Sequence, residues 1–350
     1  MNNIELHKAN SITELLNDCP QNQIIGDNLV KAWAKINNPA YGNIVCSISG
    51  GSDSDVMLDI CWRCDVDNKT KYLWFDTGLE YEATKEHLKE LEKKYNIEII
   101  KCKAIKSIPL SCKEYGQPFL SKRISSNISR LQNHGFQWEN ESFAVLLKKY
   151  CEWSDKKQDY IGCKAALMWW CNAYDDNSHF NISRNKWLKE FILANPPDFK
   201  ISDKCCHYAK KNVAAKYIKE HHVDLNMIGV RKFEGGQRST AYKSCFDTNE
   251  NKYDNYRPLF WYKNEDKVCY EEHYGIKHSN CYTEYGLNRT GCAGCPFGRD
   301  FEFELEVIKQ YEPKLYKAVN HIFGDSYAYT RKYRDFCKQR NAELKNKRGD

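Results

Sequence analysis

One short stretch of the sequence combines glycine, serine and aspartate in a pattern that suits phosphate binding. Ser49-Gly50-Gly51-Ser52-Asp53-Ser54 directly follows the apolar run Ile44–Ile48. An apolar run that ends in small and acidic residues is typical of a buried strand leading through a tight turn into a helix. Glycines let the backbone close around an anion, while serine hydroxyls and the first N–H groups of the helix donate hydrogen bonds to it. An ordinary glycine-rich turn is the plainer alternative.

This stretch resembles the S-G-G-x-D-S/T PP-loop of the adenine nucleotide α-hydrolases at every fixed position. It lacks the G-K-S/T of a Walker loop, so the resemblance implies attack at the α-phosphate with pyrophosphate or a sulfated group leaving. The glycine amides would take up developing phosphoryl charge, and Asp53 would place Mg²⁺. All six residues would bind nucleotide, and the implied catalytic residues are Ser49, Gly50, Gly51, Asp53 and Ser54.

Further segments resemble the phosphoadenosine phosphosulfate (PAPS) reductase family. Asp76-Thr77-Gly78 resembles the start of the D-T-G-x-x-x-x-E-T segment that follows the PP-loop in this family. Gly229–Arg238 resembles its G-x-R-x-x-E-x-x-x-R segment, in which the arginines hold the nucleotide or its sulfate. Arg257-Pro258-Leu259, with Trp261 and Asp266, is similar to its R-P-L-x-x-W-x-x-x-D-V step. The resemblance thus adds five nucleotide-binding residues, which are Asp76, Thr77, Gly78, Arg231 and Arg238. A capping aspartate and a charged surface loop are the alternatives.

Two cysteine pairs have the residue types of a metal centre. Cys205 and Cys206 are adjacent, and Cys292 and Cys295 form a C-x-x-C after 85 intervening residues. A C-x-x-C alone fits a redox pair, half of a zinc site or two structural thiols. Together the pairs resemble the C-C-x(about 80)-C-x-x-C pattern that binds a [4Fe–4S] cluster in adenosine phosphosulfate (APS) reductases. Adjacent cysteines hold one tetrahedral zinc poorly, so iron–sulfur is favoured, with Cys245 and Cys281 as substitute ligands.

One part of a sulfonucleotide reductase is missing from the sequence. Those enzymes carry a C-terminal E-C-G-L-H whose cysteine attacks sulfur, whereas the late Cys337 lies in R-D-F-C-K-Q-R. We therefore expect an enzyme that binds ATP or a related adenine nucleotide and cleaves ATP between the α- and β-phosphates, in sulfur transfer or nucleic-acid modification. Its partners would be a sulfur-donor protein and a nucleic-acid acceptor. The alternatives are a divergent [4Fe–4S] APS or PAPS reductase and a non-catalytic nucleotide-sensing or nucleic-acid-binding module.

The elements expected around the motifs alternate between strand and helix. Besides the PP-loop strand, the pattern predicts strands over 72–75, 97–103 and 225–230 and helices over 82–95 and 213–221. This rhythm predicts an α/β fold with a Rossmann-like, doubly wound parallel sheet that binds ligands at the carboxyl ends of its strands. We divide the chain into a helical lead-in (1–40), a PP-loop half (41–104), a helical insertion (105–200), a second half with the cluster cysteines (201–300) and a basic helical C-terminus (301–350).

Inside the insertion, helix patterns occur around 143–150 and 161–173. Tryptophans are more often core or cap residues than base-stacking platforms, and this applies to Trp138, Trp153, Trp169 and Trp170. In the C-terminal region, residues 331–340 interleave aromatic and basic side chains. A solvated helix end is favoured there over a surface that binds a polyanion.

Composition narrows the setting. The 350 residues are 41% hydrophobic and 29% charged, and no apolar run approaches the roughly 20 residues needed to cross a bilayer. The N-terminus lacks the apolar core of a signal peptide, so we expect a cytoplasmic protein with no membrane partner. There the 17 cysteines would be thiols or metal ligands rather than disulfides. A formal charge of +6 suits nucleotides as well as nucleic acids.

Overall fold

The protein is represented by a computed structural model that describes residues 6–176, 178–234, 242–248 and 253–346. Two compact units form. The first, here the α/β unit, contains residues 1–105 and 209–293, and the second, here the helical unit, contains residues 106–208 and 294–350. In the part of the chain described, no helix has both the length and the apolar character needed to cross a membrane.

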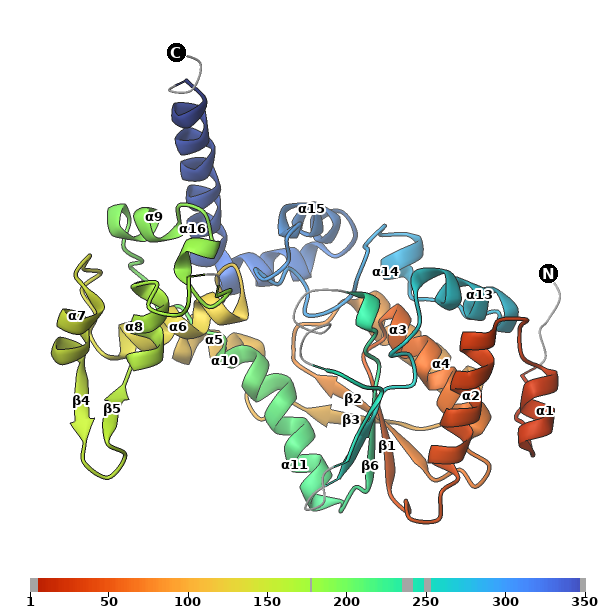
Figure 1. The fold of residues 1–350 in the computed structure, drawn as a ribbon. Helices are drawn as coiled ribbons and strands as arrows, with labels where there is room; N and C mark the ends of the chain where they lie inside the picture. The colour runs from red at the N-terminus through yellow and green to blue at the C-terminus, as the bar shows by residue number, and fades with distance from the viewer. Residues whose placement is uncertain (1–5, 177, 235–241, 249–252, 347–350) are drawn as a thin grey trace. The chain divides into compact units, whose positions relative to one another are not determined.

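A six-stranded sheet forms the centre of the α/β unit (Figure 1). Its strands, in chain order, are β1 (Ile44–Ile48), β2 (Thr70–Asp76), β3 (Ile99–Lys103), β6 (Leu225–Ile228), β7 (Phe246–Asp247) and β8 (Asp254–Tyr256). The spatial order is β3-β2-β1-β6-β8-β7, and all neighbours are parallel except β7 and β8. The winding direction therefore reverses between β1 and β6. This confirms the predicted Rossmann-like parallel sheet.

Helices cover both faces of this sheet. They are α1 (Ile12–Asn17), α2 (Gln23–Ile36), α3 (Ser52–Cys64), α4 (Glu82–Tyr95), α11 (Asn212–Glu220), α13 (Asn264–Tyr274) and α14 (Asn280–Thr283). The bounds of α4 agree with the prediction. In the lead-in, Ser11 caps α1 and Asn22 caps α2 through their side-chain oxygens, so the chain breaks into two helices there.

The strand side chains alternate between two apolar layers. Cys46 and its neighbours on the same face pack with α2, α3, α4 and α13, whereas Val45 and Leu73 pack on the other face with Ile218 of α11 and Val223. Figure 1 shows α11 on one side of the sheet and α2 to α4 on the other. Burial on both faces explains why β1 is an apolar run without polar alternation.

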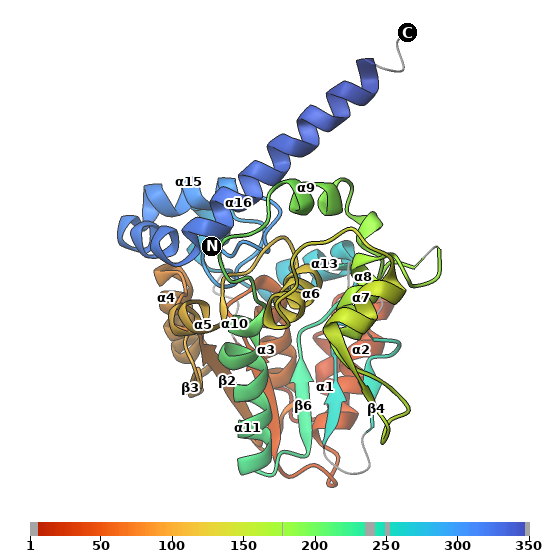
Figure 2. The same cartoon turned by 90° about the vertical axis from the view of Figure 1, so that its left-hand side faces the viewer.

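The helical unit is built from many short helices and one long one. Its elements are α5 (Ile108–Tyr115), α6 (Lys122–Asn133), α7 (Phe143–Tyr150), β4 (Cys151–Ser154), β5 (Asp159–Gly162), α8 (Lys164–Trp170), α9 (Leu188–Ala194), α10 (Lys204–Cys206), α15 (Phe301–Tyr311) and α16 (Pro313–Asn346). A π-helical segment, His207–Lys211, continues α10 into α11 across the boundary in the chain. Figure 2 shows α16 as one continuous helix.

One expectation for the insertion was wrong. Residues 161–173 do not form one helix, because Asp159–Gly162 pairs antiparallel with Cys151–Ser154 and helix α8 starts only at Lys164. This hairpin also leaves Trp153 52% exposed, so of the two roles expected for it, core or cap, the core is excluded. Trp169 and Trp170 are buried as expected.

The basic C-terminal stretch packs against its own unit. Tyr333 and Phe336 of α16 contact the ring of Phe191 on α9, with centroid distances of 5.2 and 5.6 Å. Arg331 forms an ion pair with Glu302 at 2.8 Å. These partly buried aromatic side chains therefore pack against the core of the helical unit.

Candidate nucleotide-binding site and cysteine cluster

The predicted phosphate loop connects the end of β1 to the start of α3. Residues 49–51 form the turn between Ile48 and Ser52. Gly50 has a φ of +67°, and a Cβ there would lie only 2.7 Å from Thr84 Cγ2. Both the positive φ and the lack of space for a Cβ require glycine at this position. Because the winding reverses beside β1, the loop lies at the place where open α/β sheets bind ligands.

The Ser54 hydroxyl holds the loop closed. It accepts hydrogen bonds from the backbone N–H groups of Ser49 at 3.2 Å and Gly51 at 3.1 Å, and it donates to the Gly51 carbonyl at 2.8 Å. The Ser52 N–H donates to the Tyr282 hydroxyl at 3.1 Å. An anion that accepts hydrogen bonds from these backbone N–H groups would therefore displace the hydroxyl groups of Ser54 and Tyr282, which accept those bonds in this structure.

Asp53 joins the loop to the neighbouring strand. Its Oδ1 accepts a hydrogen bond from Arg231 Nε at 3.0 Å, and Arg231 follows β6 across the reversal point. Burial alone would raise the pKa of Asp53, but Arg231 and Lys267 outweigh it and hold that pKa below its usual value. Arg238, the other predicted arginine, lies outside the described residues.

Lys267 of α13 is a site residue that the sequence reasoning missed. Its ammonium lies 2.7 Å from Ser52 Oγ, 3.3 Å from Asp53 Oδ1 and 3.1 Å from Glu271 Oε1, and its side chain is only 12% exposed. The sequence does hold a sign of this residue. Lys267 directly follows Asp266, and at that position the R-P-L motif of the resembling family has an apolar valine instead of a cation. Two cations therefore reach the PP-loop.

Buried His87 and half-buried His278 lie behind the loop. Asp55 Oδ2, on the first turn of α3, is 2.8 Å from His278 Nδ1 and 3.1 Å from His87 Nε2. His278 Nε2 lies 2.9 Å from Glu271 Oε1. Burial lowers the pKa of His278, but Asp55 and Glu271 together raise it to about 9. Through Glu271 this group is continuous with Lys267 and the PP-loop.

The D-T-G segment closes the end of β2. Asp76 Oδ1 accepts the Gly78 N–H at 3.0 Å, and Oδ2 forms an ion pair with Lys101 at 2.8 Å. The Thr77 N–H donates to Glu80 Oε1 at 2.9 Å. Asp76 thus has the geometry of a capping residue, and a ribose hydroxyl would share it with these partners.

The four predicted cluster cysteines are divided between the two units. Cys205, Cys206 and Cys295 belong to the helical unit, whereas Cys292 belongs to the α/β unit. There the Cys292 thiol lies 3.7 Å from Thr77 Oγ1.

The substitute ligands lie elsewhere in the α/β unit. Cys281 is buried, with its thiol 3.5 Å from Thr84 Oγ1, and Cys245 packs against the sheet core. Across the described ranges, no three histidine, cysteine, aspartate or glutamate side chains are arranged to hold a single metal ion.

A cysteine absent from the predicted set joins the others in the helical unit. Cys112 of α5 and Cys205 of α10 are both buried. The adjacent Cys112 thiol, together with burial, raises the pKa of Cys205 well above its ordinary value, and Cys295 acts in the same direction. No motif or spacing in the sequence distinguishes Cys112 from the other buried cysteines.

Cys337 has a structural environment. It is half-buried on α16, and its thiol donates to the Lys186 carbonyl at 3.7 Å within the helical unit. Nothing in this contact activates it as a nucleophile.

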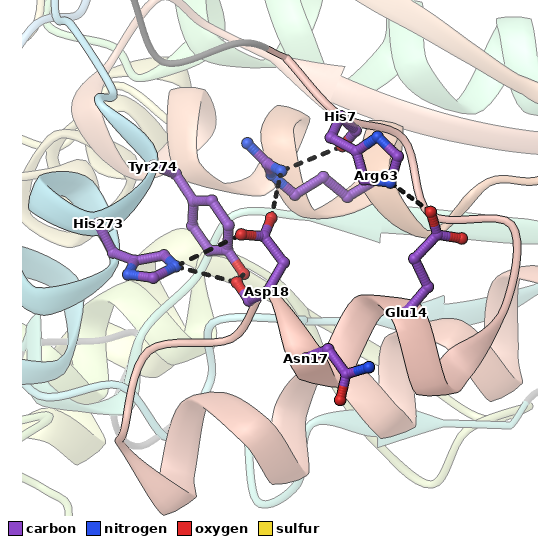
Figure 3. Close-up of a pocket in the computed structure, with 7 residues that line it drawn as sticks. All are labelled: His7, Glu14, Asn17, Asp18, Arg63, His273 and Tyr274. Carbon is purple, nitrogen blue, oxygen red and sulfur yellow. Dashed lines mark hydrogen bonds and ion pairs between the residues drawn. The ribbon is translucent and has the colours of Figure 1, made fainter. Parts of the chain in front are cut away.

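A separate cavity of about 360 Å³ opens near the other end of α3 (Figure 3). Its lining residues are His7, Glu14, Asn17, Asp18, Arg63, His273 and Tyr274. Asp18 receives most of the contacts: its carboxylate lies 3.4 Å from Arg63 Nη1, and its carbonyl accepts from the Tyr274 hydroxyl at 2.7 Å. Arg63 lies in the last turn of α3 and Ser52 in the first, about 16 Å apart along the axis. This cavity is therefore distinct from the PP-loop.

With this geometry in view, comparison with known proteins identifies the part of the chain around the loop. Residues 43–124 match the phosphoadenosine phosphosulfate reductase domain. The match begins just before β1 and includes the PP-loop and the D-T-G segment. The PAPS reductase resemblance inferred from these motifs is thereby confirmed for this segment.

Longer similarities extend beyond the PAPS reductase domain. The uncharacterized protein MJ0066 of Methanocaldococcus jannaschii is 27% identical over 299 residues, which cover 84% of this chain and 43% of that protein. The chain thus spans less than half the length of this relative.

Among solved structures, the PAPS reductase of Candida auris in a phosphate complex is 12% identical, with a TM-score of 0.41 over 82% of this chain and 98% of that one. The U34-tRNA thiolase NcsA of Methanococcus maripaludis, solved with its [4Fe–4S] cluster, is 13% identical, with a TM-score of 0.36 over 88% of this chain and 78% of that one.

Proposed function

We propose that the chain binds an adenine nucleotide at the PP-loop and cleaves ATP between the α- and β-phosphates. The observation that carries the proposal is the meeting of Arg231 and Lys267 at Asp53, where the winding of the sheet reverses. A polyphosphate needs fixed cations beside a backbone cradle, and both are present here. The loop also lacks the Walker lysine that serves the β- and γ-phosphates.

The resident residues divide the work of binding. Gly50 and Gly51 let the backbone approach the α-phosphate, and the amides now bonded to Ser54 and Tyr282 would donate to its oxygens. Arg231 offers a planar fork and Lys267 a point charge, and both, aligned by Asp53, would neutralise the leaving pyrophosphate.

The reaction class follows from the bond that breaks. An acceptor oxygen attacks the α-phosphorus, the bond to the oxygen bridging the β-phosphorus breaks, and pyrophosphate leaves with that oxygen. A sulfur nucleophile then displaces AMP from the acceptor. The proposal therefore includes a nucleic-acid acceptor and a sulfur-donor protein as partners.

Magnesium at Asp53 does not fit the residues as they stand. The Asp53 carboxylate already shares two cations, Arg231 and Lys267, which leaves it without the free charge that a Mg²⁺ ligand needs. We therefore derive no step through Mg²⁺ and assign Asp53 to the alignment of these cations.

An iron–sulfur cluster is part of the proposal. The expected ligands are Cys205, Cys206, Cys292 and Cys295, and the grouping of thiols in the helical unit fits a thiolate-bound centre by donor chemistry. Such a cluster would supply either electrons or a binding position for sulfur. These cysteines are buried or half-buried, which would limit the access of water to the cluster.

Anaerobic incubation with ATP, APS and PAPS in separate reactions tests this function. We expect pyrophosphate and AMP from ATP in the presence of a nucleic-acid pool and a persulfide donor, with no sulfite from PAPS. Asp53→Asn should abolish the signal, whereas Cys337→Ser should not. Sulfite release from APS or PAPS with a thiol donor, lost in Cys337→Ser, would instead establish a sulfonucleotide reductase. Tight nucleotide binding without turnover under all conditions would indicate a sensing module.

A further inference from the structure

The segment from α14 to Thr290 lies against the PP-loop inside the α/β unit. The hydroxyl of Tyr282, on α14, accepts a hydrogen bond from the Ser52 N–H at 3.1 Å. The same hydroxyl accepts a second hydrogen bond from the Thr290 N–H at 3.2 Å, and it lies 3.3 Å from Thr290 Oγ1. One tyrosine oxygen therefore receives backbone donors both from the PP-loop helix and from the Thr290 segment.

Three hydroxyl oxygens surround the backbone of Gly51. A Cβ at this position would lie 3.1 Å from Thr290 Oγ1, 3.2 Å from Ser49 Oγ and 3.4 Å from the Tyr282 oxygen. The absence of a Cβ lets the Thr290 segment approach the loop this closely. The PP-loop is thus faced by polar groups of a second segment as well as by its own serines.

Contacts that involve no ligand hold the Thr290 segment in place. Just beyond Thr290, the Ala293 N–H donates to the Leu79 carbonyl at 2.9 Å. The Cys292 thiol lies 3.7 Å from Thr77 Oγ1. Thr77 and Leu79 follow β2, whereas the PP-loop follows β1. The segment is therefore fixed across the carboxyl ends of two neighbouring strands, where a ligand of this sheet would lie.

A cation reaches the residue that supplies the first of these donors. The Lys267 ammonium lies 2.7 Å from Ser52 Oγ, and its side chain is only 12% exposed. A tyrosine hydroxyl is neutral and needs no cation beside it. Backbone N–H groups next to an ammonium are instead complementary to an anionic oxygen, such as that of a phosphate.

The plainer explanation is that Tyr282 permanently caps α3. The Ser52 N–H belongs to the first turn of this helix, where N–H groups have no partner within the helix and a hydroxyl can satisfy one. That explanation covers one of the two hydrogen bonds. It does not cover the Thr290 N–H, which lies outside any helix, or the nearby ammonium of Lys267.

We propose that Thr290 is a phosphate-binding residue of the nucleotide site and that the Tyr282 hydroxyl occupies the position of a phosphate oxygen until nucleotide binds. The N–H groups of Ser52 and Thr290 then donate to one oxygen of the bound phosphate, and Lys267 balances its charge. This inference rests on nucleotide binding in the proposed function and adds a second backbone segment to the PP-loop. Because the hydroxyl competes for both donors, Tyr282 lowers the affinity of the site.

Calorimetric titration of the full chain with a non-hydrolysable ATP analogue tests the competition. Tyr282→Phe keeps the ring and removes the hydroxyl, so it should bind the analogue about 3- to 10-fold more tightly than the parent. Tyr274→Phe is the matched control, because its hydroxyl donates to the Asp18 carbonyl near the other end of α3, and it should keep the affinity of the parent. Unchanged affinity in Tyr282→Phe would make the hydroxyl a permanent cap, and weaker binding would make it a ligand donor. Either result overturns the competition.

The Thr290 N–H is tested by removing it. Thr290→Pro lacks this donor and should bind the analogue at least about 10-fold more weakly than Thr290→Ala, which keeps the N–H and loses only the side-chain oxygen. Circular dichroism would verify that both variants fold. Equal affinities in the two variants would remove the Thr290 N–H from the site.

Amide signals provide a second measurement that needs no variant of the site. In the parent chain labelled with ¹⁵N-serine and ¹⁵N-threonine, inorganic pyrophosphate should shift the signals of both Ser52 and Thr290, because each N–H exchanges a hydroxyl acceptor for an anionic one. A Thr290 signal that stays in place while the Ser52 signal moves would overturn the proposal. This measurement decides if Tyr282→Phe or Thr290→Pro unfolds. A parent that binds neither probe refutes nucleotide binding itself, whereas a parent that binds the analogue with no gain in Tyr282→Phe refutes this inference alone.

Discussion

Replacing His278 should remove a pH-dependent part of the stability of the α/β unit. The imidazole lies between Asp55 and Glu271, at 2.8 and 2.9 Å, and these carboxylates raise its pKa from the ordinary 6.5 to about 9. The folded state therefore binds the proton more tightly than the unfolded state does. The resulting stabilisation is fully present below pH 6.5 and is lost as the pH rises through about 9.

The magnitude follows from the pKa difference. Each unit corresponds to about 1.4 kcal/mol, so a fully buried pair would contribute about 3 kcal/mol. The His278 side chain is 18% exposed, and solvent screening reduces the value, so we expect about 1.5 kcal/mol. Between about pH 6 and about pH 9.5, the parent should lose about 1.5 kcal/mol more of its unfolding free energy than His278→Gln does.

Urea unfolding followed by circular dichroism at the two pH values measures this difference. Thiols, tyrosines and lysines titrate in both proteins, so their effects cancel in the comparison. His321→Gln, at an exposed histidine on α16, should keep the pH dependence of the parent. If the parent and His278→Gln lose equal free energy between the two pH values, the coupling between His278 and the two carboxylates does not exist in solution.

Three further substitutions test the PP-loop itself. Lys267→Met should weaken binding of a non-hydrolysable ATP analogue about 10- to 100-fold in calorimetry, because a charge-assisted contact contributes about 1.5–3 kcal/mol; unchanged affinity would remove Lys267 from the site. Gly50→Ala should lower the free energy of unfolding by at least about 2 kcal/mol relative to the parent. The loss should exceed that of Gly286→Ala, where φ is nearly the same at +68° but no atom lies within 4 Å of the added methyl. Equal losses in the two variants would mean that the contact between the methyl added at position 50 and Thr84 is relaxed. Asp53→Asn should abolish pyrophosphate release while leaving the thermal midpoint within a few degrees, and activity at the parent rate would make the loop structural only.

Local patterns in the sequence were sufficient for the α/β half of the fold. An apolar run followed by S-G-G-S-D-S defined β1 and the start of α3, and the bounds of α4 were predicted correctly. These features depend on residues close in the chain, where periodicity and capping act. The β4–β5 hairpin was missed because each strand has only four residues, too few to show an alternation distinct from the adjacent helices.

The contacts at the candidate site depended on the tertiary structure. The sequence by itself determined the loop, its glycines, Arg231 after β6 and two cysteine pairs, because each of these is a motif with fixed local spacing. Lys267 reaches Ser52 across 215 residues, and Cys112 meets Cys205 across 93, so no local pattern records either contact. Such pairings are decided by how whole elements pack: α13 against α3, and α5 against α10 through the Gly116–Gln117 backbone. The sequence therefore predicts which residues carry suitable side chains, whereas long-range packing of helices and strands determines which of them meet in one site.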